Sequence, residues 1–168
     1  EDQRGLADQD SGRGICPGNG GKAFTKAGDS ILIQQPVYYP FSEVIRDNDR
    51  VIVSNDLILG DDNRYHIDLA DFEKQIVEHD VKLFLLCNPH NPSGRVFTKE
   101  ELTAMGDICV KHGVTVVSDE IHNDFVFRGE HTVLRPSRRS SRTSAWSARL
   151  RAKPSTWQAY DLEYICPE

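Results

Sequence analysis

Three short clusters of polar and aromatic residues in the middle of the chain could do chemistry. Residues 35–41 (Q-P-V-Y-Y-P-F) can present an aromatic ring to a flat ligand, because their prolines restrict the backbone. Residues 88–94 (N-P-H-N-P-S-G) form a rigid loop with two Asn-Pro pairs, in which a cis proline fits. Residues 118–122 (S-D-E-I-H) place a carboxylate that can stabilise a positively charged nitrogen. Taken singly, the clusters are also compatible with an aromatic turn packed on the core, an ordinary loop and a cap.

Each cluster follows a segment that we predict as a strand. Residues 30–34, 81–87 and 114–117 are short apolar runs, and residues 51–53 add another. The segment 81–87 is apolar along nearly its whole length, as in a strand buried on both faces of a sheet. Ligands bind beyond the carboxyl ends of the strands in parallel sheets, so we expect the three clusters at one edge.

Helices are predicted between these strands. Thr98 and Glu101 have the spacing of a capping box, and Gly113 ends the helix that they begin. Asp68 can cap a second helix. Apolar residues recur at helical spacing in both helices and in a shorter one: Phe41, Val44 and Ile45; Leu69, Phe72, Ile76 and Val77; Leu102, Met105, Ile108 and Cys109. The alternation predicts an α/β fold with a mostly parallel sheet and flanking helices.

Together, the order and spacing of the clusters resemble the class I/II aminotransferase superfamily of fold-type-I pyridoxal 5′-phosphate (PLP) enzymes. The resemblance covers residues 22–132 and is strongest to the cystathionine β-lyase, or C–S lyase, branch. It implies a partial large domain that binds PLP. Tyr38 would stack on the pyridine ring, Asn91 would hydrogen-bond its 3′-oxygen beside a cis Asn91–Pro92 bond, and Asp119 would pair with the protonated ring nitrogen. His122 would be a second donor near the 3′-oxygen, or alternatively a buried neutral histidine.

The resemblance also implies an activity and partners. We expect α,β-elimination on a sulfur-containing amino acid, with a homodimer for the intact family member. A class I/II aminotransferase is one alternative, because the matched residues serve the cofactor and not the substrate. A non-catalytic aminotransferase-like domain that binds an effector in a regulator is another.

Two family motifs are missing, and both would fall in flanks without periodicity, residues 1–21 and 133–168. Codons that encode residues 138–168 can encode P-S-K-T-F-N-L when read from their third base, which resembles the Schiff-base lysine motif. Codons for residues 5–21 can encode T-P-G-V-V, which resembles the phosphate-binding motif. We therefore expect both flanks to be out of frame and disordered as written, and this chain to be an inactive fragment. Lys153 lacks the motif's surroundings, so we assign no catalytic residue.

Charge and cysteine content agree with a cytoplasmic protein that binds neither nucleic acid nor a membrane. The net charge is −6, yet the segment from Val133 onward holds seven Lys and Arg against three Asp and Glu. We attribute this basic segment to shifted codons and not to nucleic-acid binding. No cysteine has zinc-site spacing, and no metal is expected. Cys87 and Cys109 lie in apolar stretches, which predicts buried free thiols.

Overall fold

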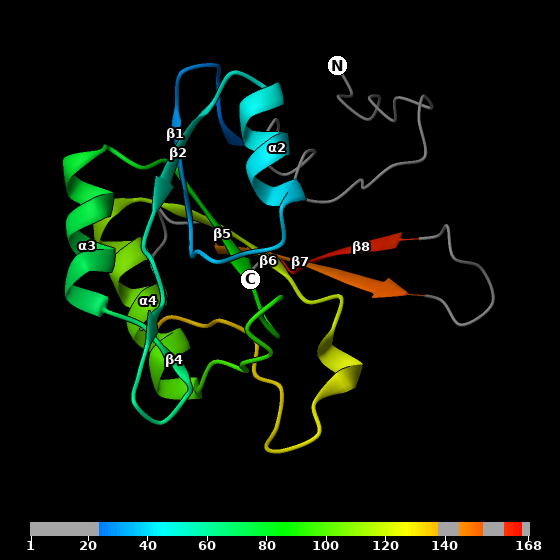
Figure 1. Ribbon diagram of the computed structural model, residues 1–168. Coiled ribbons are helices and arrows are strands. Elements are labelled where there is room, and N and C mark those ends of the chain that lie inside the picture. Colours follow the sequence, from blue (N-terminus) through cyan, green and yellow to red (C-terminus); the bar gives the residue numbers. More distant parts are fainter. Residues whose placement is uncertain (1–23, 138–144, 153–159, 166–168) are drawn as a thin grey trace.

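The protein is built around one twisted sheet, with helices on both faces. The computed structural model describes residues 24–137, 145–152 and 160–165. The six strands lie in the order β2-β1-β5-β6-β7-β8, and all except β8 are parallel (Figure 1). Their bounds are β1 Ser30–Ile33, β2 Val51–Ser54, β5 Leu83–Cys87, β6 Thr115–Asp119, β7 Ala145–Ala152 and β8 Tyr160–Ile165. A small antiparallel pair, β3 (Ile58–Leu59) and β4 (Tyr65–His66), stands apart from this sheet.

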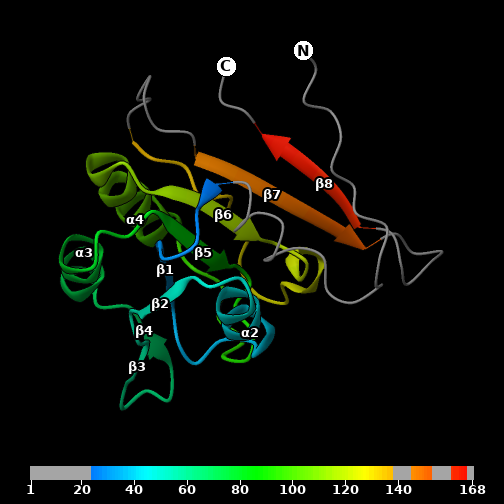
Figure 2. The same cartoon turned by 90° about the horizontal axis from the view of Figure 1, so that it is seen from above.

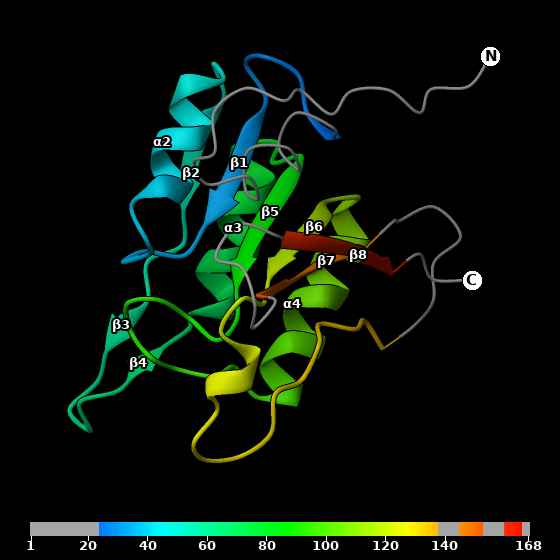
Figure 3. The same ribbon diagram turned by 90° about the vertical axis from the view of Figure 1, so that its right-hand side faces the viewer.

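The helices cover the two faces unequally. Helix α2 (Pro40–Asp47) lies on one face, and α3 (Leu69–Glu78) and α4 (Lys99–His112) lie on the other (Figures 2 and 3). Alternate residues of the strands supply the two cores, because successive side chains of a strand point to opposite faces. One core joins α2 to Ile31, Ile33, Leu83, Leu85, Cys87 and Val117. The other joins α3 and α4 to Leu32, Val53, Phe84, Leu86, Val114 and Val116.

The ends of the helices follow the predicted signals. The Asp68 carboxylate accepts hydrogen bonds from the backbone N–H groups of Ala70 and Asp71, at 2.9 and 3.0 Å. Thr98 begins α4 with both halves of the capping box in place, and Gly113 ends it in the left-handed conformation (φ 70°). The predicted strands and helices of the central region are therefore confirmed, as are the buried free thiols of Cys87 and Cys109.

Two predictions need correction. We grouped Val77 with the buried face of α3, but its side chain is 58% exposed. It lies about 100° around the helix from the buried Ile76. We also expected no regular structure in residues 133–168, where the structure forms β7 and β8. Apolar and polar residues alternate through both segments, a period of two that is typical of strands.

The fold class is confirmed as α/β, with a mostly parallel sheet between helices. Within the part of the chain that the structure describes, no helix is both long and apolar enough to span a membrane. The segment 1–21 and Lys153 lie outside the described residues.

Candidate active site

The three clusters meet at one edge of the sheet. They follow β1, β5 and β6, which are neighbouring parallel strands, so the carboxyl ends of these strands lie side by side. Cys87, the last residue of β5, is in register with Asp119, the last residue of β6. The backbone N–H of Asn88 donates to the carbonyl oxygen of Asp119 at 2.9 Å. The backbone N–H of Tyr38 donates to the carbonyl oxygen of Asn91 at 2.8 Å.

Tyr38 and Asn91 present side chains that are still available to a ligand. Tyr38 is 45% exposed, and its ring contacts that of Tyr39 edge to face, with centroids 5.3 Å apart. The Asn91 side chain is partly buried, and its amide makes no hydrogen bond to the described residues. The Asn91–Pro92 peptide bond is cis, as predicted. An aromatic ring and a free amide thus stand on two loops that are hydrogen-bonded to each other.

Asp119 is a partly buried carboxylic acid at the end of β6. Burial raises the pKa of its carboxyl group above the ordinary value of 3.8, while hydrogen bonding and His122 act against this shift. Its Oδ1 accepts a hydrogen bond from the backbone N–H of Ile121 at 3.1 Å. Among the described residues, no side chain forms a salt bridge with it. A cationic nitrogen at this edge would offset the cost of its ionisation.

His122 lies three residues beyond Asp119, where the 3-10 turn Asn123–Phe125 begins. Its ring faces that of Phe125, with centroids 6.4 Å apart, and its ring nitrogens make no hydrogen bond to the described residues. It is partly buried. It therefore differs from a buried histidine whose nitrogens are satisfied by backbone groups.

His90 is a buried residue of the same edge that the sequence did not single out. Its side chain is 2% exposed and lies between the loop after β1 and its own turn. Nε2 is 3.1 Å from the carbonyl oxygen of Gln34, and Nδ1 is 2.8 Å from the Ser93 hydroxyl. The signal was present in N-P-H-N-P-S-G, but no sequence rule separates a buried histidine there from an exposed one.

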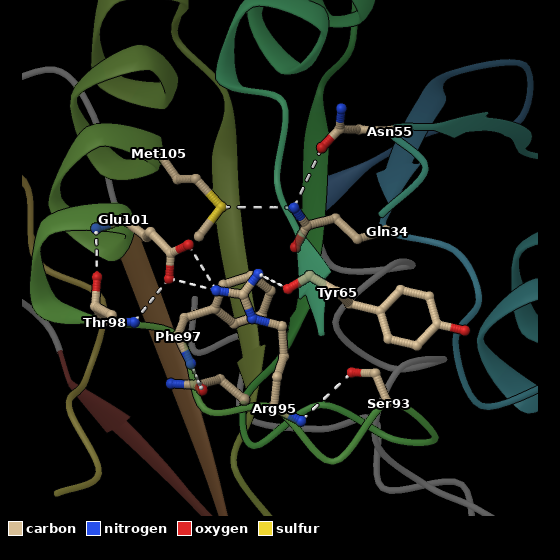
Figure 4. Close-up of polar contacts among 10 residues, drawn as sticks. Gln34, Asn55, Tyr65, Ser93, Arg95, Phe97, Thr98, Glu101 and Met105 are labelled. Carbon is tan, nitrogen blue, oxygen red and sulfur yellow. Dashed lines mark hydrogen bonds and ion pairs between the residues drawn. The ribbon is translucent and has the colours of Figure 1, made fainter. Parts of the chain in front are cut away.

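Arg95 anchors the far side of this turn (Figure 4). Its Nη2 donates to both carboxylate oxygens of Glu101 at 2.6 Å, and its Nη1 donates to the carbonyl oxygen of Tyr65 at 2.8 Å. The guanidinium also stacks on Phe97, 4.4 Å from the ring centroid. One side chain thereby joins the turn to helix α4 and to strand β4.

The segment after β6 contacts the site at Asn88 and Glu120, through Thr132 and His131. Asn88 donates from Nδ2 to the carbonyl oxygen of Thr132 at 3.0 Å and accepts at Oδ1 from the backbone N–H of Phe97 at 3.2 Å. The fully buried Glu120 lies 3.1 Å from Nε2 of His131. These contacts tie Thr132 to the end of β5 and His131 to Glu120, the residue after Asp119.

The described lysines do not supply a nucleophile at this edge. Each of them is exposed: Lys26, Lys74, Lys82, Lys99 and Lys111. None belongs to the three clusters. The edge described so far therefore has groups that could hold a cofactor, but within residues 24–137 no buried lysine that could bond to one.

Comparison with known proteins decides the family. The model for aminotransferase class I and II matches residues 12–148, most of the chain. The chain belongs to the aminotransferase class I and II family. The match begins before residue 22 and ends after residue 132, so it takes in part of each flank of this aminotransferase-family core.

Individual relatives include both lyases and aminotransferases. Cystathionine beta-lyase PatB of Bacillus subtilis is 49% identical over 112 residues, which are 66% of this chain and 29% of PatB. Aspartate aminotransferase of Sulfolobus acidocaldarius is 32% identical over 107 residues, 64% of this chain and 26% of that enzyme. Cystalysin from Treponema denticola, whose crystal structure contains a pyridoxal 5′-phosphate cofactor, is 38% identical in sequence. The two structures match with a TM-score of 0.70 over 80% of this chain and 35% of cystalysin. The chain thus spans less than a third of the length of these two curated relatives.

Proposed function

We propose that this chain is part of a PLP-dependent C–S lyase that resembles cystathionine β-lyases, and that the edge formed by β1, β5 and β6 is its cofactor site. The proposal rests mainly on the environment of the Asp119 carboxyl group. Burial raises the pKa of this group, and no described side chain forms a salt bridge with it. A pyridine ring that is protonated on its nitrogen supplies a compensating positive charge.

The other residues fit the same cofactor. Tyr38 is an exposed aromatic residue whose ring can stack on a flat heterocycle, and the side-chain amide of Asn91 can donate to an oxygen substituent of that heterocycle. His122 brings a second donor from the turn after β6. Asp119 would hold the proton on the ring nitrogen. Because the Tyr38 and Asn91 loops share a backbone hydrogen bond, they can contact one ligand together.

PLP, when bound, draws electron density from the Cα atom of an amino-acid substrate. For a lyase, the substrate carries sulfur on Cβ: the Cα–H and Cβ–S bonds break, and with water the products are a thiol, a keto acid and ammonia. The identity to PatB and cystalysin favours this reaction. Amino-group transfer is the second candidate, supported by the aspartate aminotransferase relative. We propose a homodimer for the intact protein.

The lyase and the transferase can be told apart with the intact protein. Its full open reading frame should be expressed and incubated with L-cystathionine, with and without a 2-oxo acid acceptor. A lyase releases a titratable thiol without any acceptor, whereas a transferase needs the acceptor and releases no thiol. Release of neither product would refute both assignments.

We propose further that the chain as written does not bond covalently to PLP, and that single-base frameshifts lie near Lys22 and Val133. The test is to treat the 168-residue chain with PLP and borohydride and to measure its mass. We expect no lysine carrying the cofactor, so a specific adduct at Lys153 would overturn the assignment. Sequencing the gene tests the frameshifts directly, because a one-base change at each junction must restore both motifs.

The variant Asp119→Asn tests the role of the carboxylate. Because the folded-state pKa is raised, the folded chain holds this proton more tightly than the unfolded chain. Its stability therefore falls as pH rises from about 3.8 through the folded-state pKa. At pH 7 the neutral asparagine should give a higher free energy of unfolding without ligand, and at pH 3.5 the two proteins should unfold alike.

The same variant should bind PLP less tightly. Losing a charge-assisted hydrogen bond to the ring nitrogen should weaken binding roughly ten- to hundredfold, as equilibrium dialysis would measure. Asp61→Asn, in the exposed turn between β3 and β4, is the control and should change neither property. If Asp119→Asn leaves both PLP affinity and the pH dependence unchanged, Asp119 is not the cofactor's partner.

A further inference from the structure

We infer that His90 is a positioning residue, whose neutral imidazole with its proton on Nε2 joins the loop of Asn91 to the loop of Tyr38 and keeps both in place for a cofactor. The ligand in this inference rests on the proposed function. The hydrogen-bonded link itself does not, since it is a property of the chain alone.

The tautomer of His90 follows from its partners. A backbone carbonyl can only accept, so the 3.1 Å contact between Nε2 and the Gln34 oxygen requires a proton on Nε2. A neutral ring then has a lone pair on Nδ1, which accepts from the Ser93 hydroxyl at 2.8 Å. Ser93 Oγ in turn lies 3.4 Å from the backbone N–H of Arg95. Burial lowers the pKa of the imidazole, the hydrogen bond to Gln34 acts against this shift and the charge of Arg95 adds to it, so the net effect favours the neutral ring that the two contacts require.

The backbone of His90 closes the turn that carries Asn91. Its N–H donates to the carbonyl oxygen of Arg95, and its carbonyl oxygen accepts from Gly94, both at 2.8 Å. The side chain thus ties a closed turn to Gln34, the residue after β1. Four residues beyond Gln34, the N–H of Tyr38 donates to the carbonyl oxygen of Asn91 at 2.8 Å. The two loops are therefore joined twice, by the His90 side chain at Gln34 and by this backbone hydrogen bond at Tyr38.

Packing alone does not account for this arrangement. Phe97 meets the imidazole edge to face, with centroids 6.0 Å apart, and an apolar side chain of similar size could make that contact. It could not donate to Gln34, whose carbonyl oxygen would lose this hydrogen bond at the point where the loop leaves β1. Glutamine can place an N–H near the Nε2 position, whereas methionine fills similar volume without a donor.

A matched pair of variants of the full 168-residue chain distinguishes a hydrogen-bonding role of His90 from a packing role. The readout is hydrogen exchange at the amide of Tyr38, with the amide of Val51, bonded to Asp29 at the other end of the sheet, as an internal reference. In His90→Met the exchange of Tyr38 should accelerate about tenfold relative to Val51, and in His90→Gln it should change less than about threefold. His79→Gln, at the exposed end of α3, should change neither amide. Equal acceleration in the Gln and Met variants would reduce His90 to a packing residue.

Two further measurements keep the inference testable if a variant does not fold. Long-range ¹H–¹⁵N NMR of the unaltered chain should show a neutral His90 ring protonated on Nε2 at pH 6, and an Nδ1 proton or a charged ring would overturn the inference. PLP affinity should fall about tenfold in His90→Met and be largely retained in His90→Gln. If the unaltered chain binds no PLP, the proposed cofactor role fails. The exchange and NMR results still test whether His90 joins the two loops through its hydrogen bond to Gln34. If PLP binds equally to both variants, the positioning role fails.

Discussion

Replacing Arg95 should destabilise the chain far more than replacing another ion-paired cation. The Arg95 side chain is 15% exposed and that of Glu101 is 23% exposed, so solvent screens this pair weakly. In Arg95→Met, the two charge-assisted bonds to Glu101 are lost together with the bond to the Tyr65 carbonyl. Bonds to charged groups contribute roughly 1.5–3 kcal/mol and the stacking on Phe97 about 1 kcal/mol, while methionine keeps some of the packing. We expect a loss of about 3 kcal/mol in the free energy of unfolding.

Lys111→Met is the matched control. Lys111 pairs with Glu73 at 2.7 Å, but its side chain is 66% exposed. Surface pairs of this kind contribute about 0–1 kcal/mol, so the control should lose no more than that. Arg95→Lys should fall between the two, because an ammonium group cannot make the forked contact with Glu101 and also reach Tyr65.

Urea unfolding followed by circular dichroism measures all three variants. The midpoint should move without a change in slope if only stability changes. If Arg95→Met costs no more than Lys111→Met, the turn is held by other contacts and the reasoning from burial and geometry is wrong. The turn also carries Asn91, so faster amide exchange in residues 90–95 should accompany the loss of stability.

Two further predictions concern α4 and the buried thiols. Thr98→Ala removes the acceptor for the N–H of Glu101 and should cost about 1 kcal/mol in urea unfolding, whereas Thr98→Ser should cost little; equal losses would argue against the capping box. Burial raises the pKa of Cys87 and of Cys109 to about 12, so at pH 8 both should resist alkylation until the chain unfolds. Peptide mass mapping after timed labelling checks this, and rapid labelling of either cysteine in the folded chain would contradict it.

Much of the fold could be predicted from the sequence because its signals are local. The Asp68 cap, the Thr98–Glu101 capping box and the apolar run 81–87 each specify an element through neighbouring residues. The gathering of the three clusters was also predictable, since parallel strands bring their carboxyl ends to one edge. The roles of Tyr38, Asn91, Asp119 and His122 in binding PLP stay predictions, because they depend on a ligand.

What could not be predicted depends on contacts between distant residues. His90 meets Gln34 across 56 positions of the sequence, and Arg95 meets Tyr65 across 30. Nothing in the local spacing of either residue indicates its partner. The strands β7 and β8 were overlooked for another reason: a composition rich in Arg and Ser argued for disorder, although the alternation of residue types was present.

The positions of these contacts show how far the proposed cofactor site is organised by the described residues alone. The residues that hold the Tyr38 and Asn91 loops, His90 and Arg95 among them, all lie within the described core and find their partners there. Asp119 likewise receives its backbone contacts from Ile121 and Asn88. The edge of the sheet can therefore be organised before any cofactor arrives, and the cost of burying the Asp119 carboxylate is already present in the free chain. A ligand with a cationic ring nitrogen would relieve that cost, so binding should stabilise this chain most at pH values where Asp119 is ionised.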